Sequence, residues 1–231
     1  MKTIFLVDAD DTILDFHGAS TNAIRYAFSA FNLVWKAEYE RVYKRVNDGL
    51  WESLERREIT REKLIAVRFP LYLKELGLQG VDGDKFNEIY LTHLATNPVY
   101  IQGAREFLQK LRKLGRVYIV TNGTKKIQQS RFAISGLNDL ADGVFVSQTV
   151  GYDKPAKQYT DYVIAHIPQF EKEKAVWIGD SLSADIKASN EAGITSIWFN
   201  PHQKSVNGEV KPDFIVDNFE KIFEILQRIE N

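Results

Sequence analysis

The pattern of apolar and polar residues divides this chain into three parts. A short apolar run at residues 4–7 is followed by a long stretch in which apolar residues recur at helical spacing, with charged residues between them. From about residue 97 onward, short apolar runs alternate with helical patterns, which is typical of a parallel β-sheet with crossover helices. The pattern therefore predicts an α/β protein whose first strand is separated from the later strands by a purely helical segment.

The predicted elements follow from this pattern. The helical segment is expected to contain helices at residues 20–33, 38–56, 60–76 and 84–95. The later strands are expected at residues 117–120, 144–146, 175–178 and 196–199, and their helices at residues 104–114, 126–134, 157–167, 184–192 and 218–229. Because the helical segment is far too long for a βα loop, we predict a doubly wound, Rossmann-like parallel-sheet core with an all-helical insertion. The core would comprise residues 1–15 and 97–231, and the insertion residues 16–96.

The composition is that of an ordinary soluble globular protein. Hydrophobic residues make up 44% of the 231 residues, the formal net charge is −1, and no block of like charges points to nucleic acid. The absence of cysteine excludes disulfides, zinc–thiolate sites and a thiolate nucleophile. The first apolar run is too short for a signal peptide, and no stretch approaches transmembrane length. We expect a cytoplasmic monomer or small homo-oligomer that acts on a small molecule, with neither nucleic acid nor membrane as a partner.

Three acidic residues follow the first predicted strand. Asp8, Asp10 and Asp11 lie directly after the buried run, at the edge where ligands bind in open α/β sheets. Carboxylates crowded at a partly desolvated strand end repel one another, so they need a cation or a hydrogen-bond cage to stay ionised. A hard, oxygen-liganded cation such as Mg²⁺ fits this requirement, and an acidic turn is the structural alternative.

Two further strand ends carry groups that suit a phosphate. Thr121, Asn122 and Gly123 place a hydroxyl and backbone N–H groups at the start of a helix, whose positive end attracts anions. The same residues would also serve as a plain helix cap. Lys154 precedes Pro155, which we expect in the first turn of the next helix, so that the lysine stays in the loop facing the strand ends. A solvated surface lysine is the alternative.

A second pair of carboxylates follows the strand predicted at residues 175–178. Asp180 lies at the strand end, and Asp185 follows five residues later, in the first turn of the next helix. This spacing allows both carboxylates to point at one site. The helix dipole alone would favour Asp185, whereas a carboxylate without a partner at the end of a buried strand is costly.

Taken in order, these groups resemble the four sequence motifs of the haloacid dehalogenase (HAD) superfamily. The resemblance rests on Asp8-x-Asp10-x-Thr12, Thr121-Asn122-Gly123, Lys154-Pro155 and Gly179-Asp180-x4-Asp185. It covers the whole predicted core, and the helical insertion resembles the first type of HAD cap. It implies a HAD phosphatase, a hydrolase of phosphoric monoesters. Asp11 stands where many relatives carry glycine, and we interpret it as the mark of a subfamily.

The resemblance also implies a role for each motif residue. Asp8 would attack phosphorus and form an aspartyl-phosphate, while Asp10 would protonate the leaving oxygen and then deprotonate the attacking water. The ligands implied for Mg²⁺ are Asp8, Asp10 through its backbone carbonyl, Asp180 and, in support, Asp185. The groups implied for the phosphoryl oxygens are Thr121, Asn122 and Lys154.

The predicted cap carries a second resemblance. The cap pattern of the YjjG-like noncanonical pyrimidine 5′-nucleotidases is similar to Asn47, Leu50-Trp51, Glu55, Ile59-Thr60 and Arg68-Phe69. The alternative is that Trp51 and Phe69 form the core of the cap and that Arg68 pairs with Glu55 on the surface. For contact with a base or sugar, the candidates are Trp51 and Phe16, which lies just beyond the catalytic loop.

We therefore predict a Mg²⁺-dependent phosphatase of pyrimidine nucleoside 5′-monophosphates. Asp10 disfavours a dehalogenase, because acid–base help to an alkoxide leaving group is what a phosphatase needs. A sugar-phosphate phosphatase or a β-phosphoglucomutase-like phosphomutase shares every core motif and stays open. From another class, a catalytically idle regulatory or binding module would predict decay of at least one motif, and all four are present.

Overall fold

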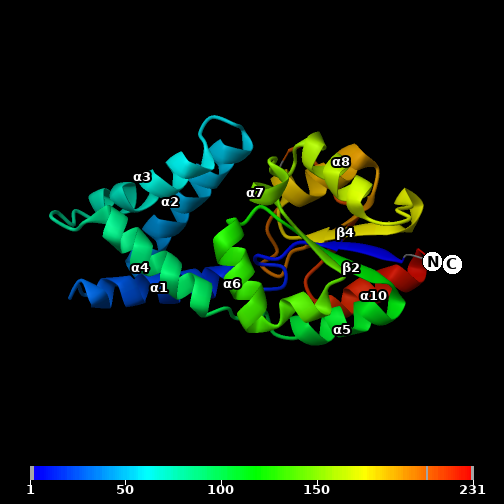
Figure 1. Ribbon diagram of the computed structural model, residues 1–231, viewed down its shortest axis with the longest axis horizontal. Helices are drawn as coiled ribbons and strands as arrows, with labels where there is room; N and C mark the ends of the chain where they lie inside the picture. The colour runs from blue at the N-terminus through cyan, green and yellow to red at the C-terminus, as the bar shows by residue number, and fades with distance from the viewer. Residues whose placement is uncertain (1–2, 207, 230–231) are drawn as a thin grey trace. The chain divides into compact units, whose positions relative to one another are not determined.

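The chain forms two compact units in the computed structural model, which describes residues 3–206 and 208–229. The first is an α/β unit made of Met1–Phe16 and Pro98–Asn231, and the second is a helical unit made of His17–Asn97 (Figure 1). The helical unit thus interrupts the α/β unit in sequence, shortly after its first strand.

One parallel sheet organises the α/β unit. Its strands are β1 (Ile4–Val7), β2 (Arg116–Thr121), β3 (Gly143–Val146), β4 (Ala175–Gly179), β5 (Thr195–Phe199) and β6 (Phe214–Val216). Their order is β3-β2-β1-β4-β5-β6, and every neighbouring pair is parallel. The predicted α/β class with a doubly wound parallel sheet is confirmed. Because the chain winds in opposite directions on the two sides of β1, the carboxyl ends of β1 and β4 form the switch point where such sheets bind ligands.

The helices complete both units. Those of the α/β unit are α5 (Ala104–Leu114), α6 (Lys125–Ser135), α7 (Ser147–Val150), α8 (Lys157–His166), α9 (Lys187–Ala192) and α10 (Phe219–Arg228). Those of the helical unit are α1 (Phe16–Ala30), which starts at the boundary, α2 (Glu38–Glu55), α3 (Arg61–Glu75) and α4 (Gly83–Thr96). None of the helices in the described ranges combines the length and apolar character that crossing a membrane would require.

Side chains of β1 alternate between the two faces of the sheet. Phe5 and Val7 belong to a core formed with α5 and α10, whereas Ile4 and Leu6 belong to a second core formed with α8 and α9. Figure 1 shows α5 and α10 on one side of the strands and α8 on the other. Burial on both faces explains why this strand reads as a continuous apolar run.

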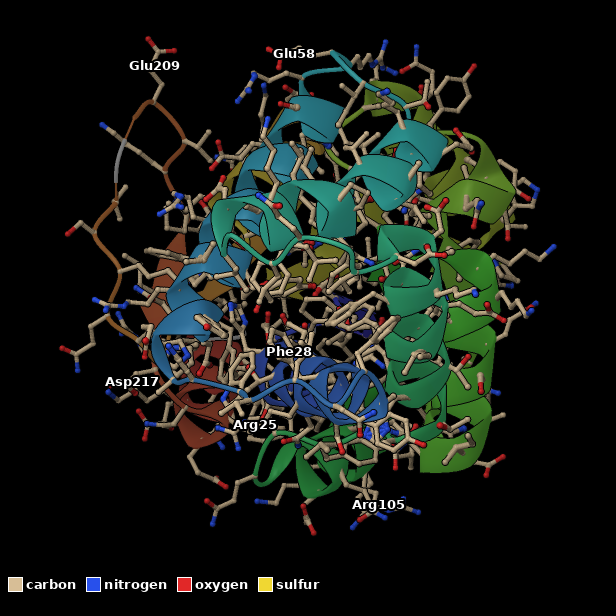
Figure 2. The ribbon with its side chains drawn as sticks, turned by 90° about the vertical axis from the view of Figure 1, so that its left-hand side faces the viewer. Arg25, Phe28, Glu58, Arg105, Glu209 and Asp217 are labelled. Carbon is tan, nitrogen blue, oxygen red and sulfur yellow. The ribbon has the colours of Figure 1, made fainter. Side chains whose placement is uncertain are left out.

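The helical unit is held together by aromatic side chains. Phe28, Phe69 and Phe86 are fully buried, with ring centroids 4.9 Å apart for Phe69 and Phe86 and 5.5 Å apart for Phe28 and Phe86. Arg25 lies on the exposed side of the same helix as Phe28 (Figure 2). This amphipathic arrangement gives the unit a core of its own.

Several predicted boundaries were wrong for physical reasons. The first cap helix was expected at residues 20–33, but α1 spans Phe16–Ala30, and Asn32 takes a left-handed φ of 54° just after its end. Pro155 is not in the first turn of a helix, because α8 begins at Lys157. The helix expected at residues 184–192 consists of a π-helical turn, Leu182–Ile186, followed by α9. The strand β6 was not predicted, because three apolar residues alone give too short a signal.

Candidate functional site

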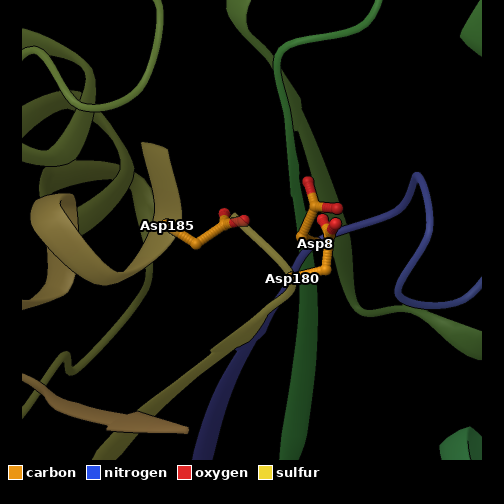
Figure 3. A group of neighbouring side chains, drawn as sticks. All are labelled: Asp8, Asp180 and Asp185. Atoms are coloured by element: carbon orange, nitrogen blue, oxygen red, sulfur yellow. The ribbon is translucent and has the colours of Figure 1, made fainter. Parts of the chain in front are cut away.

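Three carboxylates meet at the carboxyl ends of β1 and β4. Asp8 follows β1, Asp180 follows β4, and Asp185 comes from the turn after β4 (Figure 3). One oxygen of each lies within 4.8 Å of the others. The backbone N–H of Asp8 donates to the carbonyl of Ile178 at 2.9 Å, so the two strand ends are fixed against each other. The donor set consists of carboxylate oxygens only, which fits a hard divalent cation such as Mg²⁺.

A glycine lets Asp185 reach this group. A Cβ atom on Gly179 would lie 2.3 Å from Cγ of Asp185, so any side chain there would displace the carboxylate. Oδ1 of Asp185 accepts hydrogen bonds from Lys154 Nζ at 2.7 Å and from the indole of Trp177 at 3.3 Å. Oδ2 accepts from the backbone N–H of Ser181 at 3.2 Å. The carboxylate is therefore held firmly from three sides.

Lys154 is buried between two of these acids. Its Nζ atom donates to Oδ1 of Asp8 at 2.6 Å, to Oδ1 of Asp185 at 2.7 Å and to the carbonyl of Val120 at 2.8 Å. Burial alone would lower the pKa of Lys154, but the Asp185 and Asp8 carboxylates outweigh it and raise that pKa. Lys154 therefore remains a cation, and the alternative of a solvated surface lysine does not apply.

Two acids of the cluster, Asp8 and Asp180, have raised pKa values. Burial raises the pKa of Asp8 well above its ordinary value; Lys154 opposes this rise, and the neighbouring carboxylates add to it. Burial also raises the pKa of Asp180 to about 7, with further contributions from Asp11 and Asp185. Carboxylates disfavoured as anions in this way would be stabilised by a bound cation.

Thr121 and Asn122 lie at the end of β2. The hydroxyl oxygen of Thr121 accepts from the backbone N–H of Gly123 and from Nε2 of Gln128, both at 3.0 Å, so its own O–H remains a donor. The amide of Asn122 donates to the carbonyl of Lys154 at 2.9 Å and accepts from its backbone N–H at 2.8 Å. These two bonds tie the loop that carries Lys154 to the end of β2.

Asp10 occupies a different environment from Asp8. Its Oδ1 accepts from NH1 of Arg131 at 2.5 Å, and its Oδ2 accepts from Nε2 of Gln128 at 2.7 Å. Its carboxylate does not belong to the group formed by Asp8 and the other two acids among the described residues. The sequence analysis missed Gln128 and Arg131, for which there was no signal, because most positions of helix α6 are polar.

The two candidate substrate residues lie in different units. The ring centroid of Phe16 is 6.0 Å from Cζ of Arg131, which links Phe16 to Asp10 through one side chain. Trp51 belongs to the helical unit, where its ring centroid is 5.4 Å from Cζ of Arg61.

Other residues of the cap pattern are buried inside the helical unit. Arg68 is only 4% exposed and donates to the side chains of Asn47 at 3.3 Å and Asn87 at 3.2 Å. The alternative that Arg68 lies on the surface is therefore wrong. Phe69 is fully buried and contributes to the core of the unit.

Comparison with known proteins identifies the family. A family model described as a haloacid dehalogenase-like hydrolase matches residues 2–193. The chain is also 38% identical over 226 residues to the HAD-hydrolase YfnB of Bacillus subtilis, covering 98% of this chain and 95% of YfnB. The chain therefore belongs to the haloacid dehalogenase-like hydrolase family, and the predicted family and enzyme class, a hydrolase, are confirmed.

Further relatives and structures extend this likeness. The pyrimidine 5′-nucleotidase PynA of Streptococcus pneumoniae is 32% identical over 224 residues, covering 96% of this chain and 94% of PynA. The pyrimidine 5′-nucleotidase YjjG of Escherichia coli is 27% identical over 219 residues, covering 95% of each protein. The crystal structure of YfnB bound to magnesium matches with a TM-score of 0.91 at 37% identity, covering 97% of this chain and 98% of YfnB.

Proposed function

We propose that this chain is a Mg²⁺-dependent phosphomonoester hydrolase that forms an aspartyl-phosphate on Asp8. The observation that carries the proposal is the separation of Asp8 from Asp10. Asp8 lies against the ammonium group of Lys154, whereas Asp10 is bound by Gln128 and Arg131. Two carboxylates from one strand end thus have different surroundings, as a nucleophile and a separate proton carrier require.

The reaction would proceed in two steps. In the first, a carboxylate oxygen of Asp8 bonds to phosphorus, the bond from phosphorus to the ester oxygen breaks, and Asp10 gives its proton to that oxygen. In the second, a water oxygen bonds to phosphorus while Asp10 takes a proton from the water, and the bond to Asp8 breaks. Phosphate leaves and both aspartates return to their starting states. Among the described residues, Oδ2 of Asp8 accepts no hydrogen bond, so this oxygen is available for attack.

Lys154, Thr121 and Asn122 are the groups that we assign to phosphoryl binding. Lys154 would attract the phosphoryl oxygens through its positive charge, and the O–H of Thr121 and the backbone N–H of Asn122 would donate to them. Mg²⁺ would be held by Asp8, the backbone carbonyl of Asp10 and Asp180, with Asp185 in support, and would offset the repulsion between phosphate and carboxylates. The all-carboxylate cluster and the magnesium bound to YfnB support this assignment.

Pyrimidine nucleoside 5′-monophosphates are the substrate class that we propose. The similarity to PynA and YjjG, both named pyrimidine 5′-nucleotidases, supports this class. We assign residues 16–96 as a cap and residues 1–15 and 97–231 as the catalytic core. Because the phosphate-binding groups cannot distinguish one phosphate ester from another, selectivity would fall to side chains such as Phe16 and Trp51.

The test is a comparison of kcat/KM for phosphate release in the presence of Mg²⁺. Deoxyuridine 5′-monophosphate should be the best substrate in a set that also contains glucose 6-phosphate and β-glucose 1-phosphate. A higher value for either sugar phosphate would overturn the nucleotide assignment. Conversion of β-glucose 1-phosphate to glucose 6-phosphate without phosphate release would identify a phosphomutase, and no turnover of any phosphate ester would identify a binding module.

A further inference from the structure

Two side chains of helix α6 enclose the carboxylate of Asp10. Arg131 donates from NH1 to Oδ1 at 2.5 Å, and Gln128 donates from Nε2 to Oδ2 at 2.7 Å. The two residues lie three positions apart and so share one face of the helix. The Asp10 side chain is 26% exposed, yet each of its oxygens has a donor from the protein.

The enclosing side chains are themselves fixed. Arg131 also donates from NH1 to Oε1 of Gln128 at 2.9 Å, and Gln128 donates from Nε2 to the hydroxyl of Thr121 at 3.0 Å. Gly123 makes room for this contact, because a Cβ atom there would lie 2.4 Å from Nε2 of Gln128. One amide group therefore contacts both Asp10 and the hydroxyl that we assign to phosphate binding.

Fold stability does not explain the presence of Arg131. Its side chain is 1% exposed, and its Nε and NH2 atoms are buried without a hydrogen-bond partner in the described part of the chain. A buried cation whose N–H groups lack acceptors contributes less to the free energy of unfolding than an apolar side chain of similar size would. Packing therefore does not account for Arg131, whereas its hydrogen bond to Asp10 gives it a function.

We propose that Gln128 and Arg131 are positioning residues that hold Asp10 in the orientation needed for proton transfer. This inference rests on the proposed function, in which Asp10 carries the proton. Each carboxyl oxygen has two lone pairs, so one donor on each oxygen leaves a place for the proton. Without these donors, a partly exposed aspartate would populate several rotamers, and proton transfer requires hydrogen-bond reach to the ester oxygen.

The leaving-group dependence of kcat/KM tests this role. For a two-step phosphatase, kcat/KM covers the steps up to departure of the alcohol, where Asp10 acts as the acid. Phenyl phosphate releases a more basic phenolate than p-nitrophenyl phosphate and depends more on that proton. Gln128→Met and Arg131→Met should each lower kcat/KM for phenyl phosphate by about 10–100-fold and for p-nitrophenyl phosphate by less than about threefold.

Two exposed residues supply matched controls. Gln129→Met on the same helix and Arg105→Met on α5 make the same chemical changes away from Asp10, and both should leave the ratio between the two esters unchanged. Arg131→Lys keeps the positive charge and should recover part of the lost rate for phenyl phosphate.

The outcomes separate this inference from the proposed function. Equal losses for the two esters, or no loss for either, in Gln128→Met and Arg131→Met would overturn the positioning role while leaving the phosphatase assignment intact. If Arg131→Met fails to fold, the same comparison of kcat/KM for the two esters is made with Gln128→Met and Arg131→Lys. A parent enzyme that hydrolyses neither ester would overturn the proposed function and this inference with it.

Discussion

Nζ of Lys154 lies 2.7 Å from Oδ1 of Asp185, and both side chains are almost completely buried. Removal of one partner from a buried ion pair leaves the other charge without compensation, which destabilises a protein by up to about 3–5 kcal/mol. We expect Asp185→Asn to lower the free energy of unfolding by an amount that approaches this range. The loss is reduced because Asp8 still compensates part of the charge of Lys154. Urea unfolding followed by circular dichroism measures the change.

A surface ion pair provides the control for that experiment. Lys157 and Asp161 lie 2.7 Å apart on α8, but their side chains are 77% and 56% exposed. Asp161→Asn should therefore change the free energy of unfolding by less than about 1 kcal/mol. Similar losses from the two substitutions would contradict the structural role assigned to the buried pair.

Asp8→Asn should abolish turnover without unfolding the chain. The amide is a poor nucleophile, so we expect kcat to fall by at least about 10⁴-fold. The amide has the same size as the carboxylate and its oxygen can still accept from Lys154, so the chain should remain folded, which circular dichroism checks. Asp10→Asn should lower kcat by about 10²–10⁴-fold through loss of proton transfer. Steady-state phosphate release measures both, and parental activity in Asp8→Asn would exclude the aspartyl-phosphate mechanism.

Stability without metal should fall as the pH rises. The pKa of Asp180 is raised by burial to about 7 in the folded chain, against 3.8 ordinarily, so between these values the folded state holds a proton that the unfolded state has lost. This contribution is present below about pH 4 and is lost as the pH rises through about 7. Mg²⁺ would compete with the proton, so it should raise the melting temperature more at about pH 8 than at about pH 5.

The matching measurement is thermal unfolding over this pH range, in chelator and in excess Mg²⁺. Asp180→Asn removes one of the titrating groups and should weaken the pH dependence of stability in chelator. A Mg²⁺-induced rise in melting temperature that is equal at both pH values would contradict the assignment of Asp180 to the metal site.

The sequence predicted the strands of the sheet where burial is complete. Residues 4–7 lie in a strand with both faces covered, so their apolar run carried an unambiguous signal. The edge strand β6 has only three residues, and Ile215 is 51% exposed, so the same signal was missing. Pattern reasoning therefore works best at the centre of this sheet, and the proposed site lies there.

The partners of Asp10 could not be predicted in the same way. Motif spacing located the acids near the strand ends, because all of them follow β1 or β4 within a few residues. Gln128 and Arg131 reach Asp10 across more than one hundred residues of sequence, through a helix whose rotation only the tertiary structure sets. The spacing of residues along the sequence gives no information about the rotation of this helix.

Gly179→Ala should damage both stability and activity. The added Cβ would lie 2.3 Å from Cγ of Asp185, so the carboxylate that holds Lys154 must move. Overpacking of this kind costs about 1–3 kcal/mol, and kcat should fall because Lys154 loses its support. Gly49→Ala is the control: it lies within α2, and its Cβ meets no atom within 4 Å, so it should be neutral or stabilising by up to about 1 kcal/mol. A smaller effect at Gly179 than at Gly49 would show that the strand end adapts easily.

Phe16→Ala should lower kcat/KM for deoxyuridine 5′-monophosphate more than for a small aryl phosphate. An aromatic face suits a flat base, and loss of one base-stacking contact costs about 1–3 kcal/mol in proteins that bind single-stranded nucleic acid. Phe16 also lies 6.0 Å from the guanidinium of Arg131, so its loss has a second route to Asp10. The two routes can be distinguished by the ratio of kcat/KM for p-nitrophenyl phosphate to kcat/KM for phenyl phosphate. Loss of base stacking leaves this ratio unchanged, whereas displacement of Asp10 raises it. Equal losses for the nucleotide and the aryl phosphates would exclude Phe16 as a residue that selects the base.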